Sequence, residues 1–428
     1  MKKTLALMLA LVMVLAVIPA MAADTRTSGL YTYEIKGNGT ITITAFDWKN
    51  NKGDVYIPNM IDGYTVTGIG DEAFAFEDKN YSPHSITLPE GIKSIGDKAF
   101  FNANIDSINL PASLQHIGAG AFYNSPCCKF KPTPNHPYFA VIDAGLYNKA
   151  KKELITYSWG NIGVERKWPD DRLYTISIPE GIQSLGAYSI AGMIDQGSYM
   201  EIHISLPTSL VSIGDFALAP SGYCWYETLT GNLPNLKTIG KGAFERTKAL
   251  GCDLKMPSVE TIGDYAFSSC SLYTRSNEGY AIDFTGSPLK SIGNRSFGYM
   301  QISTSTDNGN YFKIPINKCS NIGPGNSGLG MLMTSQSKFS PELTVIPSDL
   351  NPKVSSLPAT VTAIESGAFT STVDNFRLST SLNDIAVDAF PKGSSFIVDA
   401  GSYAELWCSE NGFAYSIEGQ EDDLSWLN

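Results

Sequence analysis

The sequence repeats one six-residue frame ten times. Each copy reads aliphatic residue, usually Gly, two variable residues, a small residue and then usually Phe. The copies start at Ile69, Ile95, Ile117, Leu185, Ile213, Ile239, Ile262, Ile292, Ile364 and Ile385. One unit of about 20–30 residues cannot bury its own apolar side, so such a repeat is typical of a solenoid whose coils stack on one another.

The distances between copies also predict coils that the frame does not mark. Successive copies start 26, 22, 68, 28, 26, 23, 30, 72 and 21 residues apart. The two long distances are close to three periods of about 23 residues. We therefore expect degenerate coils in both gaps.

A second motif, apolar-any-apolar-Pro, precedes most copies. It ends at Pro58, Pro89, Pro111, Pro179, Pro207, Pro257 and Pro315. Apolar residues two apart lie on one face of a strand, and Pro ends the strand because it lacks an N–H. The residues between the apolar pairs should point outward: Tyr56, Thr87, Asn109, Ser177, Ser205, Lys255 and Lys313. The Gly of the frame suits a tight turn, in which positive φ is common, although Glu365 and Ala386 replace it in two copies, so the requirement is not absolute.

These two motifs together resemble the BspA-type, or Treponema pallidum-type, leucine-rich repeat. The segment from Ile86 to Phe100 fits that family closely, although the Cys usual after the Phe is matched well only by Cys270. The segments 135–149 and 401–412 resemble the family's spacer and its closing helical segment. The resemblance covers about residues 30–417 and implies a curved solenoid displayed outside the cell that binds other macromolecules.

The expected fold is mainly β: a leucine-rich-repeat solenoid with a period of about 23 residues, an N-terminal β-hairpin cap and a short C-terminal helical cap. Residues 1–23 are read as a signal peptide and 24–64 as the N-terminal cap. The solenoid should span 65–398, with a spacer at about 127–172 and an irregular insert at about 301–340. Residues 399–428 should form the C-terminal cap and an acidic tail.

The first residues predict secretion. Lys2 and Lys3 precede an apolar run from Leu5 to Ile18, and Ala20-Met21-Ala22-Ala23 offers a cleavage site after Ala22 or Ala23. No later stretch is long and apolar enough to span a membrane. The net charge of −11 becomes −13 without the two lysines, which argues against nucleic acid and anionic membranes as partners. We expect a secreted protein that is either released or held non-covalently at the cell surface.

No motif of catalysis or cofactor binding is found. The seven Cys include no C-x-x-C pair, and the four His are scattered, so no metal and no cofactor are expected. Cys224 and Cys252 follow successive frames at similar distances and could pair across coils. The run from Gly323 to Gly328 matches G-x-G-x-x-G only formally, because it lies outside a βαβ unit, and a flexible loop is the better interpretation.

Two aromatic clusters remain as candidates for binding. Tyr223, Trp225 and Tyr226 lie between repeats, where an insertion protrudes, and such rings often anchor protein interfaces. The alternative is that they fold back over the edge of a coil, since large apolar side chains are more often buried. The second cluster, in the spacer, consists of Tyr138, Phe139, Tyr147, Tyr157 and Trp159 and favours a local core.

The sequence therefore favours a non-enzymatic protein for adhesion or for binding extracellular proteins or glycans. One alternative is a structural or assembly module of the cell surface without its own ligand. The other is a secreted hydrolase in the spacer, which would require a His and a carboxylate converging in a cleft.

Overall fold

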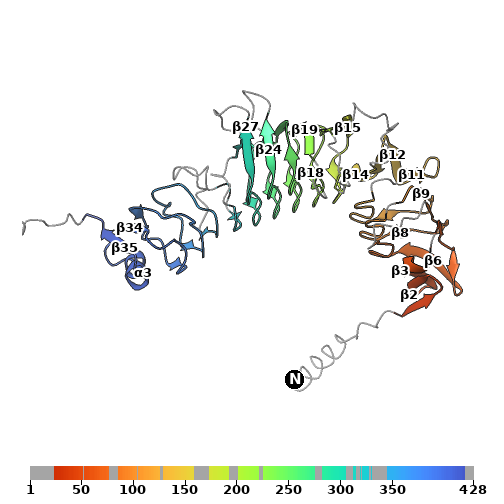
Figure 1. Ribbon diagram of the computed structural model, residues 1–428, viewed down its shortest axis with the longest axis horizontal. Helices are drawn as coiled ribbons and strands as arrows, with labels where there is room; N and C mark the ends of the chain where they lie inside the picture. Colours follow the sequence, from red (N-terminus) through yellow and green to blue (C-terminus); the bar gives the residue numbers. More distant parts are fainter. Residues whose placement is uncertain are drawn as a thin grey trace, which may run out of the picture.

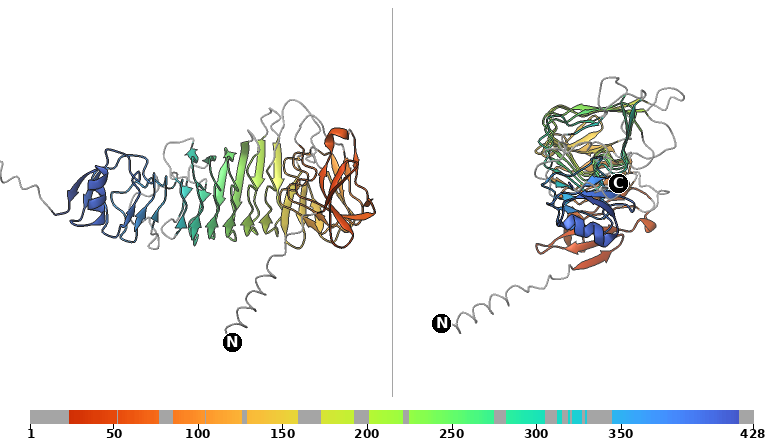
Figure 2. Two further views of the ribbon diagram at one scale, coloured as in Figure 1. Left: turned by 90° about the horizontal axis from the view of Figure 1, so that it is seen from below. Right: turned by 90° about the vertical axis from the view of Figure 1, so that its left-hand side faces the viewer.

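The chain folds into a β-solenoid, which confirms the expected mainly β class, with 35% strand and 4% helix. The computed structural model describes residues 24–51, 53–76, 85–103, 105–125, 129–158, 173–191, 201–220, 225–274, 282–304, 312–314, 319, 321–326, 329 and 345–419. Figure 1 shows a bent rod of stacked strands, and Figure 2 shows the strands side by side along its length. Interruptions in the sheets divide the rod into an N-terminal block (25–132), a central block (139–322) and a C-terminal block (345–417).

The N-terminal block has two sheets. The first has the order β1-β2-β3-β6-β8-β10, with β5 beside β6: β1 (Thr25–Ser28), β2 (Tyr31–Ile35), β3 (Thr40–Phe46), β5 (Met60–Ile61), β6 (Tyr64–Ile69), β8 (Ser94–Ile95) and β10 (His116–Ile117). The second has the order β11-β9-β7-β4: β4 (Val55–Tyr56), β7 (Ser85–Thr87), β9 (Ser107–Leu110) and β11 (Lys129–Pro132). A short 3-10 helix, η1 (Trp48–Asn50), follows β3. The antiparallel pair β2–β3 lies at the start of the stack.

The first sheet of the central block contains the strands of the frames. Its order is β12-β13-β14-β16-β18-β20-β23-β26-β29: β12 (Phe139–Ile142), β13 (Gly145–Asn148), β14 (Glu153–Tyr157), β16 (Ser184–Leu185), β18 (Ser212–Ile213), β20 (Thr238–Ile239), β23 (Thr261–Ile262), β26 (Ser291–Ile292) and β29 (Asn321–Ile322). From β14 onward the strands are parallel, each one coil further along the rod.

The second sheet of the central block branches at the long strand β19. It contains β15 (Leu173–Ser177), β17 (Glu201–Ser205), β19 (Trp225–Asn232), β21 (Lys248–Ala249), β22 (Cys252–Lys255), β24 (Ser271–Thr274), β25 (Ile282–Asp283), β27 (Gln301–Thr304) and β28 (Phe312–Lys313). The start of β19 pairs with β21 and its end pairs with β22. The sheet therefore splits into two parallel rows, one through β24 and β27 and the other through β25 and β28.

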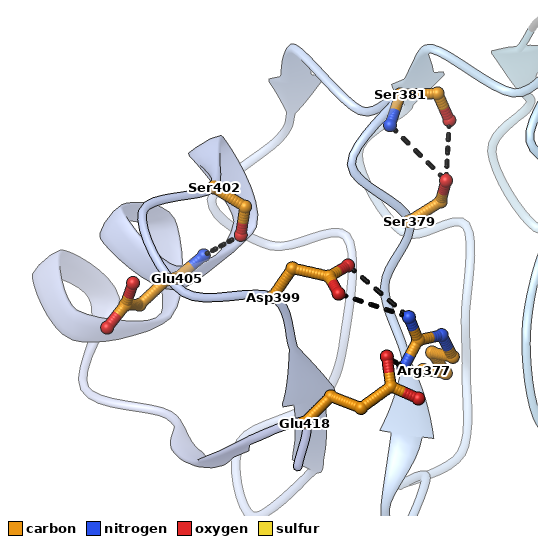
Figure 3. Close-up of polar contacts among 7 residues, drawn as sticks. All are labelled: Arg377, Ser379, Ser381, Asp399, Ser402, Glu405 and Glu418. Carbon is orange, nitrogen blue, oxygen red and sulfur yellow. Dashed lines mark hydrogen bonds and ion pairs between the residues drawn. The ribbon is translucent and has the colours of Figure 1, made fainter. Parts of the chain in front are cut away.

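The C-terminal block closes the rod with a helix. Its strands are β30 (Val345–Ile346), β31 (Ala363–Ile364) and β33 (Asp384–Ile385) in one sheet, and β32 (Phe376–Arg377), β34 (Ser395–Val398) and β35 (Ala414–Ile417) in the other. Helix α3 (Tyr403–Asn411) begins where Ser402 Oγ accepts the Glu405 N–H (3.1 Å), and it is followed by Gly412 at φ 73°. Figure 3 shows Arg377 beside Asp399 (3.2 Å) and Glu418, so one guanidinium links β32 to the residues that directly follow β34 and β35.

The spacer forms a hairpin that contacts two hydrophobic cores. Phe139, Leu146 and Ile155 pack into the core of the N-terminal block. Neighbouring Tyr147 and Leu154 pack into the core of the central block instead. Because alternate residues of a strand point to opposite faces, β13 and β14 act as a wall between the two cores.

The frame residues fill columns that run along the rod. The first-position aliphatic residues and sixth-position Phe residues are buried, except that Ile117 is partly exposed. Phe rings of successive coils stack on one another, with centroids 5.4 Å apart for Phe100–Phe122, 4.8 Å for Phe244–Phe267 and 5.3 Å for Phe267–Phe297. The residues expected to point outward from the strands do so where their side chains are described. Asn109 is partly exposed and the other described ones are exposed. The side chain of Lys313 lies outside the described part.

The expectation of positive φ at the frame Gly is wrong, and close approach of the next coil is the reason for Gly. A Cβ on Gly240 would lie 2.5 Å from Asp215 Oδ1 and 2.7 Å from Asp215 N of the preceding coil. Asp215 Oδ1 also accepts the Lys241 N–H (2.8 Å), and Asp71, Asp97 and Asp264 make the same contact in their coils. The Gly leaves room for this carboxylate–amide contact.

Positive φ occurs instead at the fourth position of nine copies. These residues are Glu72, Lys98, Gly120, Tyr188, Phe216, Gly242, Tyr265, Arg295 and Gly367, with φ between 49° and 65°. Only three of the nine are Gly, although this region of φ is unfavourable for side chains with a Cβ. Several large side chains are therefore held in left-handed backbone.

Part of the insert expected to be irregular at 301–340 is regular. β27 pairs with β24, and Ile322 aligns with Ile292, so Ile322-Gly323 occupies the first two positions of a degenerate coil. The G-x-G-x-x-G match begins at this frame Gly, because a Cβ on Gly323 would lie 2.6 Å from Asn294 N. Ile346 aligns with Ile364 as a second degenerate coil. In the other long gap, Leu154 of the hairpin aligns with Leu185.

Substituting Gly240 tests the close approach of the coils. Gly240→Ala places a methyl group against the Asp215 backbone and should lower the free energy of unfolding by about 1–3 kcal/mol. Gly37→Ala is the control, since a Cβ there meets nothing within 4 Å. Urea unfolding midpoints measure both. Equal midpoints for the two variants would contradict the proposed role of the frame Gly.

Phe100 tests the Phe column. Its ring is fully buried between Phe74 and Phe122, so Phe100→Ala should cost about 3–5 kcal/mol. Exposed Lys93 on the same coil serves as the control through Lys93→Ala. If thermal and urea unfolding show the same stability for both variants, the Phe column does not hold the coils together.

Candidate functional site

Four exposed or half-exposed side chains on three adjacent coils form the candidate site, which we call the Arg–Tyr patch. Its members are Arg246, Tyr265, Arg295 and Tyr299. They belong to the frames that start at Ile239, Ile262 and Ile292 in the central block, whose stacked strands are green to teal in Figure 1. Tyr265 and Arg295 occupy the fourth position of their frames, and Arg246 and Tyr299 occupy the eighth.

Two strand registers align these residues. β20, β23 and β26 pair so that Ile239, Ile262 and Ile292 are partners, which places Tyr265 and Arg295 on neighbouring coils. At the other end of the same turns, β21, β24 and β27 pair through Lys248, Ser271 and Gln301. Arg246, Ser269 and Tyr299 each precede these partners by two residues, so they too form a row across the coils.

All four residues have left-handed backbone, with φ 59° at Arg246, 58° at Tyr265, 50° at Arg295 and 54° at Tyr299. Two eighth positions in the N-terminal block, Asn102 and Asn124, have φ 59° as well. Asn tolerates this region far better than Arg or Tyr. At the eighth position, Arg246 and Tyr299 thus stand where Asn would fit with less strain, and residues in strained backbone often mark functional sites.

The packing leaves the ends of these side chains in solvent. Tyr299 is 78% exposed, the largest exposure among the large hydrophobic residues described. The stem of Arg295 lies over Gly325 of the next coil, where a Cβ would come within 2.3 Å of Arg295 Cγ. Since Arg can pack its stem and keep its charged head in water, the guanidinium remains available at the surface.

The two arginines of the patch differ from the other described arginines in their electrostatics. Arg26 pairs with Asp24 (2.8 Å), and Arg377 pairs with Asp399 and Glu418. Within the described ranges, neither Arg246 nor Arg295 has an acidic partner, although the whole chain has 42 acidic and 31 basic residues. The patch thus holds two guanidinium groups without an ion-pair partner among the described residues, on a chain in which acidic residues outnumber basic ones.

The aromatic residues proposed from the sequence are only partly described. Tyr226 is fully buried, and its hydroxyl donates to the Leu218 carbonyl oxygen (3.0 Å), so it belongs to the core and not to an exposed binding tip. Tyr223 and Cys224 lie outside the described residues, and the Cys224–Cys252 pairing stays a prediction. The side chain of Trp225 is also outside them, but its backbone begins β19 and pairs with Lys248, next to Arg246. The predicted segment therefore adjoins the Arg–Tyr patch.

The spacer aromatics lie mostly in the local core that the sequence favours. Phe139, Tyr147 and Tyr157 are buried, whereas Tyr138 is 38% exposed and Trp159 lies outside the described residues. Burial is the main cause of the raised pKa of both Tyr147 and Tyr157. These hydroxyls therefore stay protonated and serve packing.

A second aromatic strip crosses from the N-terminal to the central block. Tyr123 and Tyr188 meet with ring centroids 4.7 Å apart, Phe101 and Phe216 extend the strip at its ends, and Lys98 Nζ lies 5.3 Å from the Tyr188 centroid. The rings cover each other's faces. We therefore interpret this strip as packing that joins the two blocks.

The other described features that bear on chemistry are a surface hollow and several cysteines. An open hollow of about 460 Å³ is lined by Val345, Ser348, Ala363, Ile364, Glu365, Ser366, Asp384 and Ala386, without His or Cys. The described ranges contain no group of three His, Cys, Asp or Glu placed to hold a metal ion. Burial raises the pKa of Cys319 to about 11 and that of Cys408 to about 12, so both remain thiols near neutral pH. In the part of the chain that the structure describes, no helix has the length and apolar character to cross a membrane.

Sequence reasoning missed the Arg–Tyr patch because its residues occupy variable positions of the frame. The signal that was present is the contrast between copies: the eighth position changes from Asn102 and Asn124 to Arg246 and Tyr299. That contrast gains meaning only with the knowledge that the position has positive φ.

The family described as "BspA type Leucine rich repeat region" matches the chain with six copies, at residues 39–149, 169–278 and 197–321, which together exceed half of the chain. Among solved structures, a leucine-rich cell surface protein from Faecalibacterium prausnitzii is 16% identical, with 90% of this chain and 97% of that chain covered and a TM-score of 0.34. The pneumococcal vaccine antigen PcpA is 16% identical, with 94% and 99% covered and a TM-score of 0.27. The Treponema pallidum leucine-rich repeat protein is 17% identical, with 64% and 89% covered and a TM-score of 0.25. No curated protein sequence matches the chain.

Tyr299 tests whether the patch serves the fold. Tyr299→Asn removes an exposed ring and places a residue that tolerates positive φ, so the free energy of unfolding should stay the same or rise by up to about 1 kcal/mol. Thermal unfolding of the variant beside the wild type measures this. A loss of stability beyond about 1 kcal/mol would assign the ring a structural role.

Proposed function

The chain belongs to the BspA-type leucine-rich repeat family, and from this premise we propose that it is a secreted or cell-surface protein that binds an extracellular protein or glycan. The proposed contact surface is the Arg–Tyr patch together with the adjoining start of β19 at Trp225. The observation that carries this proposal is a pair of exposed arginines without acidic partners among the described residues, beside the exposed Tyr299 and the half-buried Tyr265.

The chemistry of the patch supports binding. Arg, Tyr and Trp are the residue types most enriched where interfaces gain their energy, because they combine large contact area with directional hydrogen bonds. An arginine already paired within the protein would have to exchange one carboxylate for another on binding. Arg246 and Arg295 need no such exchange.

The arrangement on the rod supports binding of an extended ligand. Parallel strands of successive coils are about 4.8 Å apart, so equivalent side chains form a regular row. The rows of the patch span the three coils of the Ile239, Ile262 and Ile292 frames, and Trp225 adds the start of β19 beside them. A solenoid can present such a row without moving its core.

Binding by the mature chain, residues 24–428, tests the proposal. A panel of glycans and extracellular-matrix proteins is screened with the wild type. The double variant Arg246→Ala/Arg295→Ala should then weaken binding to the ligand found by at least about tenfold, which corresponds to about 1.4 kcal/mol. Trp225→Ala should weaken it further if the start of β19 takes part.

Arg26→Ala is the matched control, because Arg26 is also exposed but pairs with Asp24 in β1, far along the rod from the patch. Circular dichroism and thermal unfolding confirm that all variants remain folded. Unchanged affinity in the double variant would rule out the patch as the contact surface. A wild type that binds no member of the panel but self-associates would favour the structural or assembly module.

A further inference from the structure

We propose that the Arg–Tyr patch recognises a terminal sugar that carries one carboxylate. This inference rests on the proposed function and names the class of its ligand. It follows from the placement of Arg246, Tyr265, Arg295 and Tyr299 on three successive coils of an acidic solenoid, with Tyr265 on the middle coil.

The arginines provide the site for the carboxylate. A guanidinium presents its N–H donors in a planar fork that matches the two oxygens of a carboxylate. The stem of Arg295 is packed over Gly325, which restricts its motion before a ligand arrives. Less side-chain entropy is then lost on binding, so even an exposed ion pair gains affinity.

The tyrosines provide the site for the sugar. The Tyr299 ring is 78% exposed, and Tyr265 lies half-buried on the coil between Arg246 and Tyr299. Tyr offers an apolar face that can pack on the C–H groups of a sugar ring and a hydroxyl that can hydrogen-bond to its oxygens. Arg246 and Tyr299 are two coils apart, roughly 10 Å, so the patch is small enough for the end of a glycan.

The surrounding charge favours one anionic group over a polyanion. Asp215 and Glu245 are partly or fully exposed in coils of the same block, and Asp264 precedes Tyr265 directly. The whole chain carries a net charge of −11. A polyanion that follows the rod would pass several of these carboxylates, whereas a single carboxylate needs only a guanidinium of the patch as its partner.

Pairs of ligands that differ only in the carboxylate distinguish recognition of the charge from recognition of the sugar ring. The probes are sialyllactose and oligosaccharides ending in glucuronic or galacturonic acid, each beside its carboxyl-reduced counterpart, and heparin as a polyanion. Calorimetric titration of the mature chain should show at least tenfold tighter binding of one acid than of its reduced form. Arg246→Ala/Arg295→Ala should abolish that difference, and Arg295→Lys, which keeps the charge but loses the fork, should reduce it several-fold. Arg26→Ala should leave it unchanged.

Four results would overturn the inference. Equal affinity for an acid and its reduced form would show that the patch does not recognise the carboxylate. Heparin as the ligand of highest affinity would show that a polyanion is preferred. The chain could bind none of the acids but bind a matrix protein through Arg246 and Arg295. That result would contradict the proposal that the ligand is a sugar, while the proposed function would stand. If no ligand of any class depends on Arg246 and Arg295, the proposed function fails as well.

Discussion

The close contact between one coil's backbone and the next at the frame Gly is the constraint on which the rest of the structure depends. At Gly96, Gly118, Gly240 and Gly293 a Cβ would lie within 2.7 Å of backbone atoms in the preceding coil. Only this approach lets an Asp of one coil accept the amide N–H of the next, as Asp97 does from Ala119 (2.8 Å). The same spacing stacks the Phe rings and fixes the register of the short strands. Two-residue strands such as β20 and β23 are stable because they are held in this stack.

The sequence predicted the solenoid because its period is a direct consequence of this contact. Every coil needs an aliphatic residue and a Phe facing the shared core, and both types are visible in a sequence. The reason for the Gly was not visible, because Gly satisfies both positive φ and close approach, and only coordinates distinguish the two. Degenerate coils were expected in the gap between Ile292 and Ile364, but the coil at Ile322 was not located. Pro324 and Asn326 stand at its third and fifth positions, and its Gly-rich composition is typical of loops. The hairpin wall at β13–β14 depends on contacts between distant residues that no local pattern encodes.

The candidate site was less predictable than the fold. Aromatic density drew attention to Tyr223, Trp225 and Tyr226, yet density does not distinguish a ring that covers a coil from one that faces solvent. Tyr226 lies in strand β19, where it pairs with Ala249, and its side chain is buried. Arg246 and Tyr299 occupy a position that Asn fills elsewhere, and their significance depends on backbone conformation and on missing ion-pair partners within the described residues. Neither property can be read from residue types alone.

The positions with positive φ explain how a regular stack can carry a specific surface. The first, second and sixth positions are fixed by packing, so a change there affects every neighbouring coil. The fourth and eighth positions border the turn, and a large residue there costs on the order of 1 kcal/mol in backbone strain but leaves the core in place. Gly242 lies on the coil after Phe216 and packs against its ring, and Gly325 lies on the coil after Arg295 and packs against its Cγ. In both cases the Gly makes room for the large side chain. The rod therefore carries its core-forming residues and its variable large residues at different positions of the frame. Under the proposed function, the backbone strain at Arg246 and Tyr299 accompanies the placement of contact residues at the surface.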